Sequence, residues 1–156
     1  SFHSFATKAL VDLYPEQRLA AATRHEANTL QSGIFVNDGT GSFAFRPLPR
    51  LAQAAPIFAI AFSDLEGDGD LDLCAVGNSF SPQPETGHMD GGVGLILRNT
   101  GGGLFEAIPP SESGLVIPGD AKSLHLIDLN RDGHPDLVAG INNGEVMAFL
   151  RAGASR

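Results

Sequence analysis

Short apolar runs, broken by clusters of glycine, asparagine, aspartate, serine and proline, fill the chain from residue 29 onward. Runs of this length, rich in valine, isoleucine, leucine and phenylalanine and bounded by turn-forming residues, are typical of β-strands. The pattern predicts nine strands, at residues 33–37, 43–48, 57–63, 71–77, 93–99, 104–108, 122–128, 136–141 and 145–151. Turns rather than helices separate them, which favours an antiparallel, all-β body over a βαβ sheet.

The first 28 residues have a different composition. Alanine, leucine, lysine, glutamate and glutamine are frequent there, and these residues favour helices. Pro15 can open a helix at its first position, where a missing N–H is no loss. We therefore expect one or two short helices at residues 1–28, as a lead-in to a strand-rich domain at residues 29–156.

Two segments of the strand-rich domain resemble each other. Residues 62–78 (FSDLEGDGDLDLCAVGN) and 126–142 (LIDLNRDGHPDLVAGIN) are identical at eight of 17 positions. Residues 37–43 (NDGTGSF) and 99–105 (NTGGGLF) also share an asparagine, two glycines and a phenylalanine. Internal similarity of this kind indicates a repeated structural unit. The predicted unit is a β-meander with a glycine-rich hairpin and an acidic loop between two strands.

The charge of the chain is concentrated in two places. The formal net charge of -8 argues against a nucleic-acid backbone or an anionic membrane surface as the main partner. Many of the carboxylates lie in two acidic loops, residues 64–72 and 128–136, where Arg131 is the only arginine or lysine. This segregation suggests two cation sites. No apolar stretch approaches the ~20 residues that cross a bilayer, so membrane insertion is not expected.

Both acidic loops place oxygen-bearing side chains at matching positions. Positions one, three, five and nine are Asp64, Glu66, Asp68 and Asp72 in the first loop, and Asp128, Asn130, Asp132 and Asp136 in the second. Position seven, Asp70 or His134, can add its backbone carbonyl, and glycine at position six allows a sharp bend. An all-oxygen set favours Ca²⁺ over Mg²⁺, which demands a tighter octahedron, and over soft metals. We therefore predict two calcium sites.

An EF-hand shares the first six positions of this spacing. It also requires a bidentate glutamate at position twelve and a helix on each side. Position twelve here is Ala75 or Ala139, and both loops lead into apolar, β-prone runs, which excludes an EF-hand. Turns without metal are the other alternative. A divalent cation, however, explains how the crowded negative charges of residues 64–72 are tolerated.

The acidic loops resemble the calcium loops of FG-GAP/VCBS repeats, familiar from integrin α-chain propellers and many secreted bacterial proteins. The resemblance is carried by DLEGDGDLDL at residues 64–73 and DLNRDGHPDL at residues 128–137, each between two apolar strands. Residues 83–115 are also similar to the C-terminal part of large bacterial VCBS-repeat proteins. Two positions depart from the usual pattern, since Glu66 replaces an aspartate and Arg131 replaces a small residue.

The resemblance implies a β-propeller of four-stranded antiparallel blades, with structural calcium between the first and second strands of each blade. It assigns residues 57–108 to one full blade, 122–151 to three strands of another, and 33–48 to the last two strands of a preceding one. Since propellers have about four to eight blades, this is a partial propeller. Either the chain belongs to a longer propeller, or it forms a homo-oligomer in which N-terminal strands of one copy complete the C-terminal blade of the next.

No residue pattern indicates catalysis. There is no convincing Ser/His/Asp order, phosphate-binding loop or zinc spacing. The only cysteine, Cys74, lies in an apolar run and is expected to be buried. The polar segment at residues 79–92 is long for a β connection, and it offers Glu85, His88 and Asp90 as candidates for ligand contact.

These features predict a non-enzymatic, calcium-binding module that binds a protein or carbohydrate in the extracellular space, the periplasm or at the cell surface. Extracellular calcium is abundant enough to fill loops of modest affinity. The alternative is part of a propeller-type polysaccharide lyase or hydrolase, with an active site mostly in other blades or at a subunit junction.

Overall fold

Three short helices form an N-terminal unit, residues 1–30, in the computed structural model, which describes residues 1–152. They are α1 (Phe2–Ala6), α2 (Leu10–Leu13) and α3 (Glu16–Ala20), and none of them buries a residue. The prediction of one or two helices was therefore too low, and Pro15 caps α3 instead of starting it. Within residues 1–152, no helix has the length and hydrophobicity needed to span a membrane.

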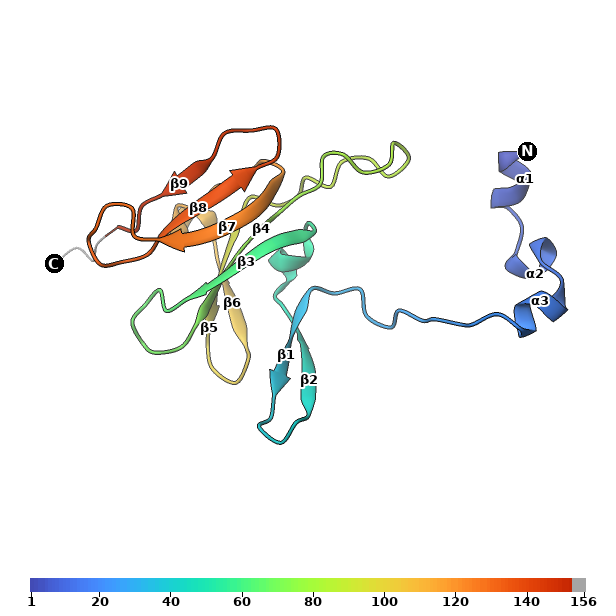
Figure 1. Ribbon diagram of the computed structural model, residues 1–156, viewed down its shortest axis with the longest axis horizontal. Coiled ribbons are helices and arrows are strands. Elements are labelled where there is room, and N and C mark those ends of the chain that lie inside the picture. Colours follow the sequence, from blue (N-terminus) through green and yellow to red (C-terminus); the bar gives the residue numbers. More distant parts are fainter. Residues whose placement is uncertain (153–156) are drawn as a thin grey trace. The chain divides into compact units, whose positions relative to one another are not determined.

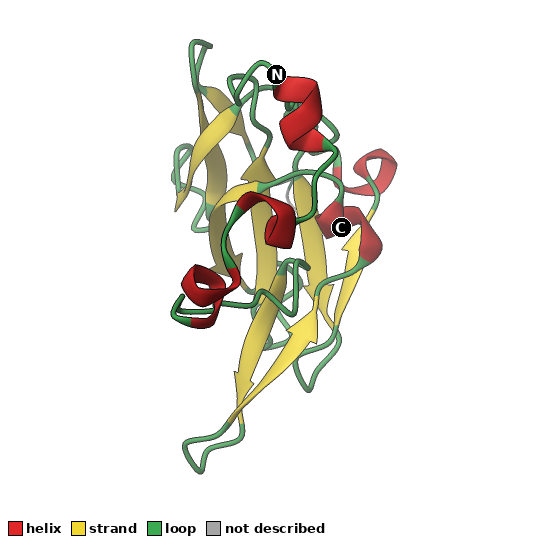
Figure 2. Ribbon diagram, turned by 90° about the vertical axis from the view of Figure 1, so that its right-hand side faces the viewer, coloured by secondary structure: helices red, strands yellow, loops and turns green. Residues whose placement is uncertain are grey.

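Antiparallel strands in three sheets make up the second unit, from residue 31 onward (Figures 1 and 2). A hairpin pairs β1 (Gly33–Asn37) with β2 (Phe43–Pro47). The four-stranded sheet is a meander of β3 (Ile57–Ser63), β4 (Asp72–Gly77), β5 (Leu95–Asn99) and β6 (Phe105–Ile108). The three-stranded sheet contains β7 (Ala121–Ile127), β8 (Asp136–Ile141) and β9 (Met147–Phe149). Every predicted strand is present, with small differences at the ends, and the all-β fold is confirmed.

The connections contain little further regular structure. A 3-10 turn, η1 (Arg50–Gln53), follows β2, and α4 (Pro110–Ser113) follows β6. Both begin directly after a proline, Pro49 or Pro109, whose fixed φ suits the entry into a helical turn. They link one sheet to the next.

The two sequence repeats also pair their first and second strands in the same register. Phe62 pairs with Leu73 in the four-stranded sheet, as Leu126 pairs with Leu137 in the three-stranded sheet. The register of each first strand shifts at the same point, between Ile57 and Ala59 or between Ala121 and Ser123. The first strands of the two sheets, β3 and β7, lie side by side (Figure 1).

Strand β4 of the four-stranded sheet is buried on both faces. One face packs Cys74 and Val76 against Leu124, Leu137 and Ala139 of the three-stranded sheet. The other face packs its apolar side chains against the hairpin and η1, with a core of Leu48, Ala52, Leu73, Ala75 and Leu97. This explains why β4 reads as a continuous apolar run instead of an alternating one. Cys74 is buried as predicted, and burial, helped by the negative charge of Asp72, raises the pKa of its thiol to about 11.

A substitution of Leu97 can test the contribution of this second core to stability, because the Leu97 side chain is 0% exposed. Leu97→Ala is expected to lower the free energy of unfolding by about 2–5 kcal/mol through lost burial and a cavity. Leu104→Ala is the matched control, since Leu104 is 55% exposed, and it should change stability by less than about 0.5 kcal/mol. Urea unfolding followed by circular dichroism measures both, and equal effects would contradict the assigned core.

Candidate functional site

Each acidic loop joins the first and second strands of its sheet, as the sequence predicts. The first acidic loop (residues 64–72) runs from β3 into β4, and the second (residues 128–136) runs from β7 into β8 (Figure 1). The two loops are therefore equivalent parts of the repeat, and their side chains can be compared position by position.

The aspartate at position one closes each turn. Asp64 accepts hydrogen bonds from three backbone N–H groups, those of Gly67, Asp68 and Gly69, at 2.6, 3.1 and 2.9 Å. Asp128 accepts them from Asp132 and Gly133, at 3.1 and 2.9 Å. The N–H groups, foremost that of Gly69, hold the pKa of Asp64 below its ordinary value. The position-six glycines have φ values of 93° and 86°, which explains why glycine is needed there.

The aspartate at position five makes the same hydrogen bond in both loops. The carboxylates of Asp68 and Asp132 accept the backbone N–H two residues ahead, from Asp70 at 2.9 Å and from His134 at 2.8 Å. In the second loop the Asn130 amide also donates to Asp132 at 2.9 Å. This amide, followed by the His134 N–H, lowers the pKa of Asp132. Positions three, five and seven of the second loop are thus connected.

The aspartate at position nine has a structural task that the sequence did not reveal. Asp72 and Asp136 are 3% and 1% exposed. One oxygen of each accepts the N–H of position two, from Leu65 or Leu129, at 2.9 Å in both loops. The other oxygen accepts an N–H at the end of the third strand of the same sheet or just after it. The donor is Asn99, at 2.9 Å, for Asp72 and Arg151, at 2.8 Å, for Asp136. Each carboxylate therefore connects its own acidic loop to the third strand of the same sheet, β5 for Asp72 and the end of β9 for Asp136.

The two residues that depart from the repeat pattern make different interactions. Glu66, at position three, forms an ion pair with Arg98 of β5, and Arg98 also lies 3.8 Å from Glu112. Glu66 is therefore engaged outside its own loop. Arg131 has a φ of 63° where the first loop has Gly67 at 79°, and this left-handed conformation costs a non-glycine residue roughly 1 kcal/mol.

The predicted metal ligands supply suitable atoms, held by the backbone of their own loops. All predicted side-chain ligands except His134 carry oxygen donors, the donor type that Ca²⁺ prefers. A carboxylate oxygen that accepts one N–H retains a further lone pair for a cation. Within residues 1–152, however, no three His, Cys, Asp or Glu side chains are grouped in a way that could hold a metal ion. The donor chemistry fits calcium, and calcium binding stays a prediction.

The 79–92 loop, the long excursion after β4 in Figure 1, has a fixed base. Ser79 and Met89 exchange two backbone hydrogen bonds, at 2.8 and 2.9 Å, and the rings of Phe80 and His88 stack with centroids 5.6 Å apart. The predicted contact residues Glu85, His88 and Asp90 are all exposed. Among the described residues, no hydrogen bond or ion pair connects the three of them.

Asn78 anchors this base, a role that was not predicted from the sequence. It is 1% exposed, its φ is 78°, and its side chain donates to the carbonyls of Gly92 and Gly119 at 2.7 and 3.0 Å. Its carbonyl accepts the Lys122 ammonium at 2.9 Å, which also pairs with Asp120 at 2.6 Å. The asparagine shared by residues 78 and 142 of the repeat was the signal that could have revealed this role.

The fold and these loops define a class: an all-β protein of repeated antiparallel meanders, with an acidic loop between the first two strands of each unit. More specifically, residues 20–75 match the family model of the FG-GAP-like repeat. The match includes the first acidic loop and confirms the predicted FG-GAP resemblance. Similarity to VCBS repeats and closure into a propeller stay predictions. No curated protein and no solved structure matches the chain significantly.

The position-nine contact can be tested without metal. In excess chelator, Asp72→Ala is expected to lower the free energy of unfolding by about 2 kcal/mol or more, because two backbone N–H groups lose their acceptor. Asp70→Ala is the control, since Asp70 lies in the same loop with an exposed side chain. Chemical denaturation measures both variants. Similar stability of the two would argue against Asp72 as a structural anchor.

Proposed function

We propose that this chain is a calcium-binding, non-enzymatic interaction module of the extracellular space or the cell envelope, with a protein or carbohydrate partner. An FG-GAP-like repeat suggests a β-propeller-like interaction module, which supports the general part of this proposal. The observation that carries the calcium part is the repetition of one oxygen-rich, hydrogen-bonded turn in both acidic loops. Such a turn gathers negative charge that a divalent cation would neutralise.

The oxygen-bearing side chains of the loops that are exposed or only partly buried would hold the cation. In the first loop they come from Asp64, Asp68 and Asp70, with Glu66 available once it leaves Arg98. In the second loop they come from Asp128, Asn130 and Asp132. Asp72 and Asp136 could each offer a further carboxylate lone pair to the cation while keeping their backbone hydrogen bonds. The ion would be structural, because carboxylates occupied by a cation are poor general acids or bases.

Added calcium is expected to raise the melting temperature and excess chelator to lower it. At a free concentration of 100 times Kd, each site stabilises the fold by about 2.7 kcal/mol, which is roughly 5–10 °C for a domain of this size. Asp68→Ala and Asp132→Ala should each remove one site, and isothermal calorimetry counts the sites that remain. Asp90→Ala, outside both loops, is the matched control. A melting temperature that calcium leaves unchanged would refute the metal part of the proposal.

The 79–92 loop is the surface proposed to contact the partner. Its base is fixed by Asn78 and by the Ser79–Met89 bridge, so its exposed tip is presented from a rigid support. Glu85 offers an exposed hydrogen-bonding group beyond this base, and His88 and Asp90 offer exposed groups beside the Ser79–Met89 bridge. Location outside the cell is proposed because millimolar calcium is available there to loops of modest affinity.

A glycan array and a polysaccharide-turnover assay separate the proposed module from the enzyme alternative. Binding without turnover, weakened at least tenfold by the combined substitutions Glu85→Gln, His88→Ala and Asp90→Asn, is expected because these groups would supply the polar contacts. Glu106→Gln, on β6, serves as a control of similar chemistry. Product formation that the same substitutions abolish would instead establish the lyase or hydrolase. A protein partner in place of a glycan would appear as binding in a pull-down with the same dependence.

A further inference from the structure

Two equivalent positions of the repeat differ sharply in exposure. Leu124 of β7 is 7% exposed, and Ile60, its counterpart on β3, is 51% exposed. Both pair with an alanine of the next strand, Ala139 or Ala75, so they occupy the same register position. Leu124 is covered by the four-stranded sheet. No corresponding pair of strands covers Ile60 and its neighbour Phe62, which is 47% exposed, among the described residues.

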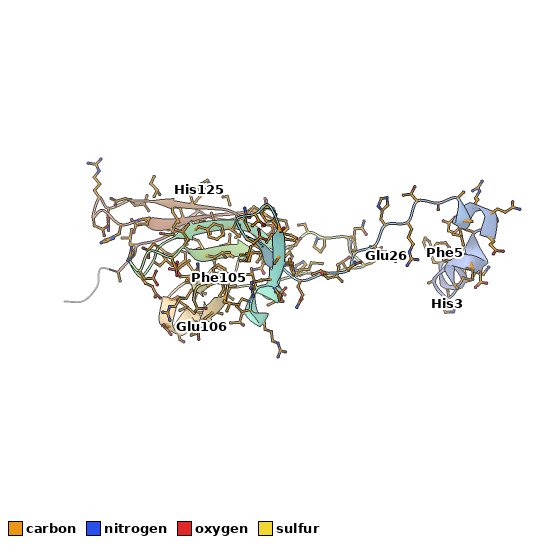
Figure 3. The ribbon with its side chains drawn as sticks, turned by 90° about the horizontal axis from the view of Figure 1, so that it is seen from below. His3, Phe5, Glu26, Phe105, Glu106 and His125 are labelled. Atoms are coloured by element: carbon orange, nitrogen blue, oxygen red, sulfur yellow. The ribbon has the colours of Figure 1, made fainter. Side chains whose placement is uncertain are left out.

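The opposite end of the strand-rich unit has the complementary open face. Val138 and Gly140 of β8 are the counterparts of Cys74 and Val76, which are buried against β7. Val138 and Gly140 are only partly buried. His125 belongs to the same open face of the three-stranded sheet, and Figure 3 shows it on the side of the unit away from Glu106. The four-stranded sheet thus exposes the large apolar side chains of Ile60 and Phe62. The three-stranded sheet exposes Val138 and Gly140, whose counterparts in the four-stranded sheet pack against the next sheet.

The β1–β2 hairpin is the equivalent of β5–β6. Each hairpin begins its turn with an asparagine whose side chain accepts the N–H two residues ahead, Asn37 from Gly39 and Asn99 from Gly101, both at 2.9 Å. The pairings Asn37–Phe43 and Asn99–Phe105 have the same register. The hairpin therefore corresponds to the third and fourth strands of a meander whose first two strands are not among the strands of this unit.

The three-stranded sheet lacks a fourth strand in the described residues, and an apolar cleft lies at that edge. The cleft has a volume of about 600 Å³ and lies beside β9. Its lining includes the apolar residues Ile96, Ile108, Leu115 and Phe149 and the charged residues Glu66, Glu112 and Arg151. The hairpin carries phenylalanines that match this cleft in chemistry. Phe35 is 68% exposed and stacks edge-to-face on Phe45, with ring centroids 5.4 Å apart.

We propose that copies of this chain associate by strand exchange, with the hairpin of one copy replacing β9 of another to complete a four-stranded sheet of β7, β8, β1 and β2. In this register Phe35 takes the place of Phe149, and Phe45 enters the cleft. Ile60 and Phe62 of the incoming copy then cover Val138 and Gly140. β9 is suited to displacement because it has three residues, fewer than any other strand of the unit described.

The exchange also preserves the buried hydrogen bond at position nine. Asp136 now accepts the N–H of Arg151, whereas its counterpart Asp72 accepts that of Asn99. Asn37 is the equivalent of Asn99, so its N–H replaces that of Arg151 when the hairpin pairs with β8. The contact joins two different faces of the chain, and such heterologous contacts form rings when they close and filaments when they do not.

Light scattering of the full chain over a range of concentrations tests the association. The expected masses are multiples of 16.3 kDa that increase with concentration, whereas a monomer throughout would overturn the proposal. Phe35→Ser is expected to raise the apparent Kd roughly tenfold or more through lost apolar burial. Phe5→Ser, which changes a phenylalanine 59% exposed in the N-terminal unit, is the control and should have no effect. Unchanged melting curves at low concentration confirm that both variants fold.

A disulfide across β8 and β9 distinguishes strand exchange from simple contact between the faces. Val138 and Ala148 are direct neighbours in the register, a distance that a disulfide can span. The double variant Val138→Cys, Ala148→Cys is expected to be monomeric when oxidised and to associate again after reduction. Cys74 is buried and should not compete in the oxidation. If the oxidised variant associates as strongly as the reduced one, β9 is not displaced and the proposal is wrong.

Discussion

The buried carboxylate at position nine is the contact on which each repeat unit depends. A buried charge is costly unless hydrogen bonds replace its water. Asp72 meets this condition because each of its oxygens accepts a backbone N–H, one from its own loop and one from the end of β5. The loop and the third strand are therefore positioned by one side chain, and Asp136 repeats the arrangement. Calcium would add charge neutralisation to a turn that already has a defined conformation.

The two sheets meet through surfaces of unequal side-chain size. Small residues of β3, Ala59 and Ala61, lie against the larger Leu124 and Leu126 of β7. A polar contact accompanies this packing, since Lys122 binds Asp120 and lies 3.2 Å from the centre of the Phe58 ring. Lys122, followed by the Asn142 amide, lowers the pKa of Asp120. Apolar packing supplies the adhesion, while the charged group fixes which residues face each other.

Features that depend on local sequence were predicted correctly. The strands follow from alternation and turn residues, and the placement of the acidic loops follows from their repetition between apolar runs. The helix count at the N-terminus was wrong because such short helices depend on single caps, such as the Ser1 hydroxyl that accepts the N–H of Ser4. Caps of this kind contribute about 1 kcal/mol each, which a composition-based prediction does not resolve.

Contacts between residues distant in sequence could not be predicted from loop spacing. Glu66 reads as a ligand within its loop, yet it pairs with Arg98, which only the pairing of β4 with β5 brings near. The Asn78 contact with Gly119 spans 41 residues and likewise requires the assembled sheets. Spacing along the chain determines which atoms a turn can offer. Tertiary pairing determines which of those atoms are already engaged.

The loop and the sheet edge of the C-terminal meander are physically coupled. Asp136 holds Leu129 of the second acidic loop with one oxygen and Arg151, just after β9, with the other. Any change that reorients the Asp136 carboxylate therefore alters its hydrogen bond to Leu129 in the turn and its hydrogen bond to Arg151 at the sheet edge. A cation bound in the loop and a strand exchanged at the edge would therefore act on the same side chain. In the four-stranded sheet Asp72 has the same two contacts, but there β6 already pairs with β5 and closes the edge.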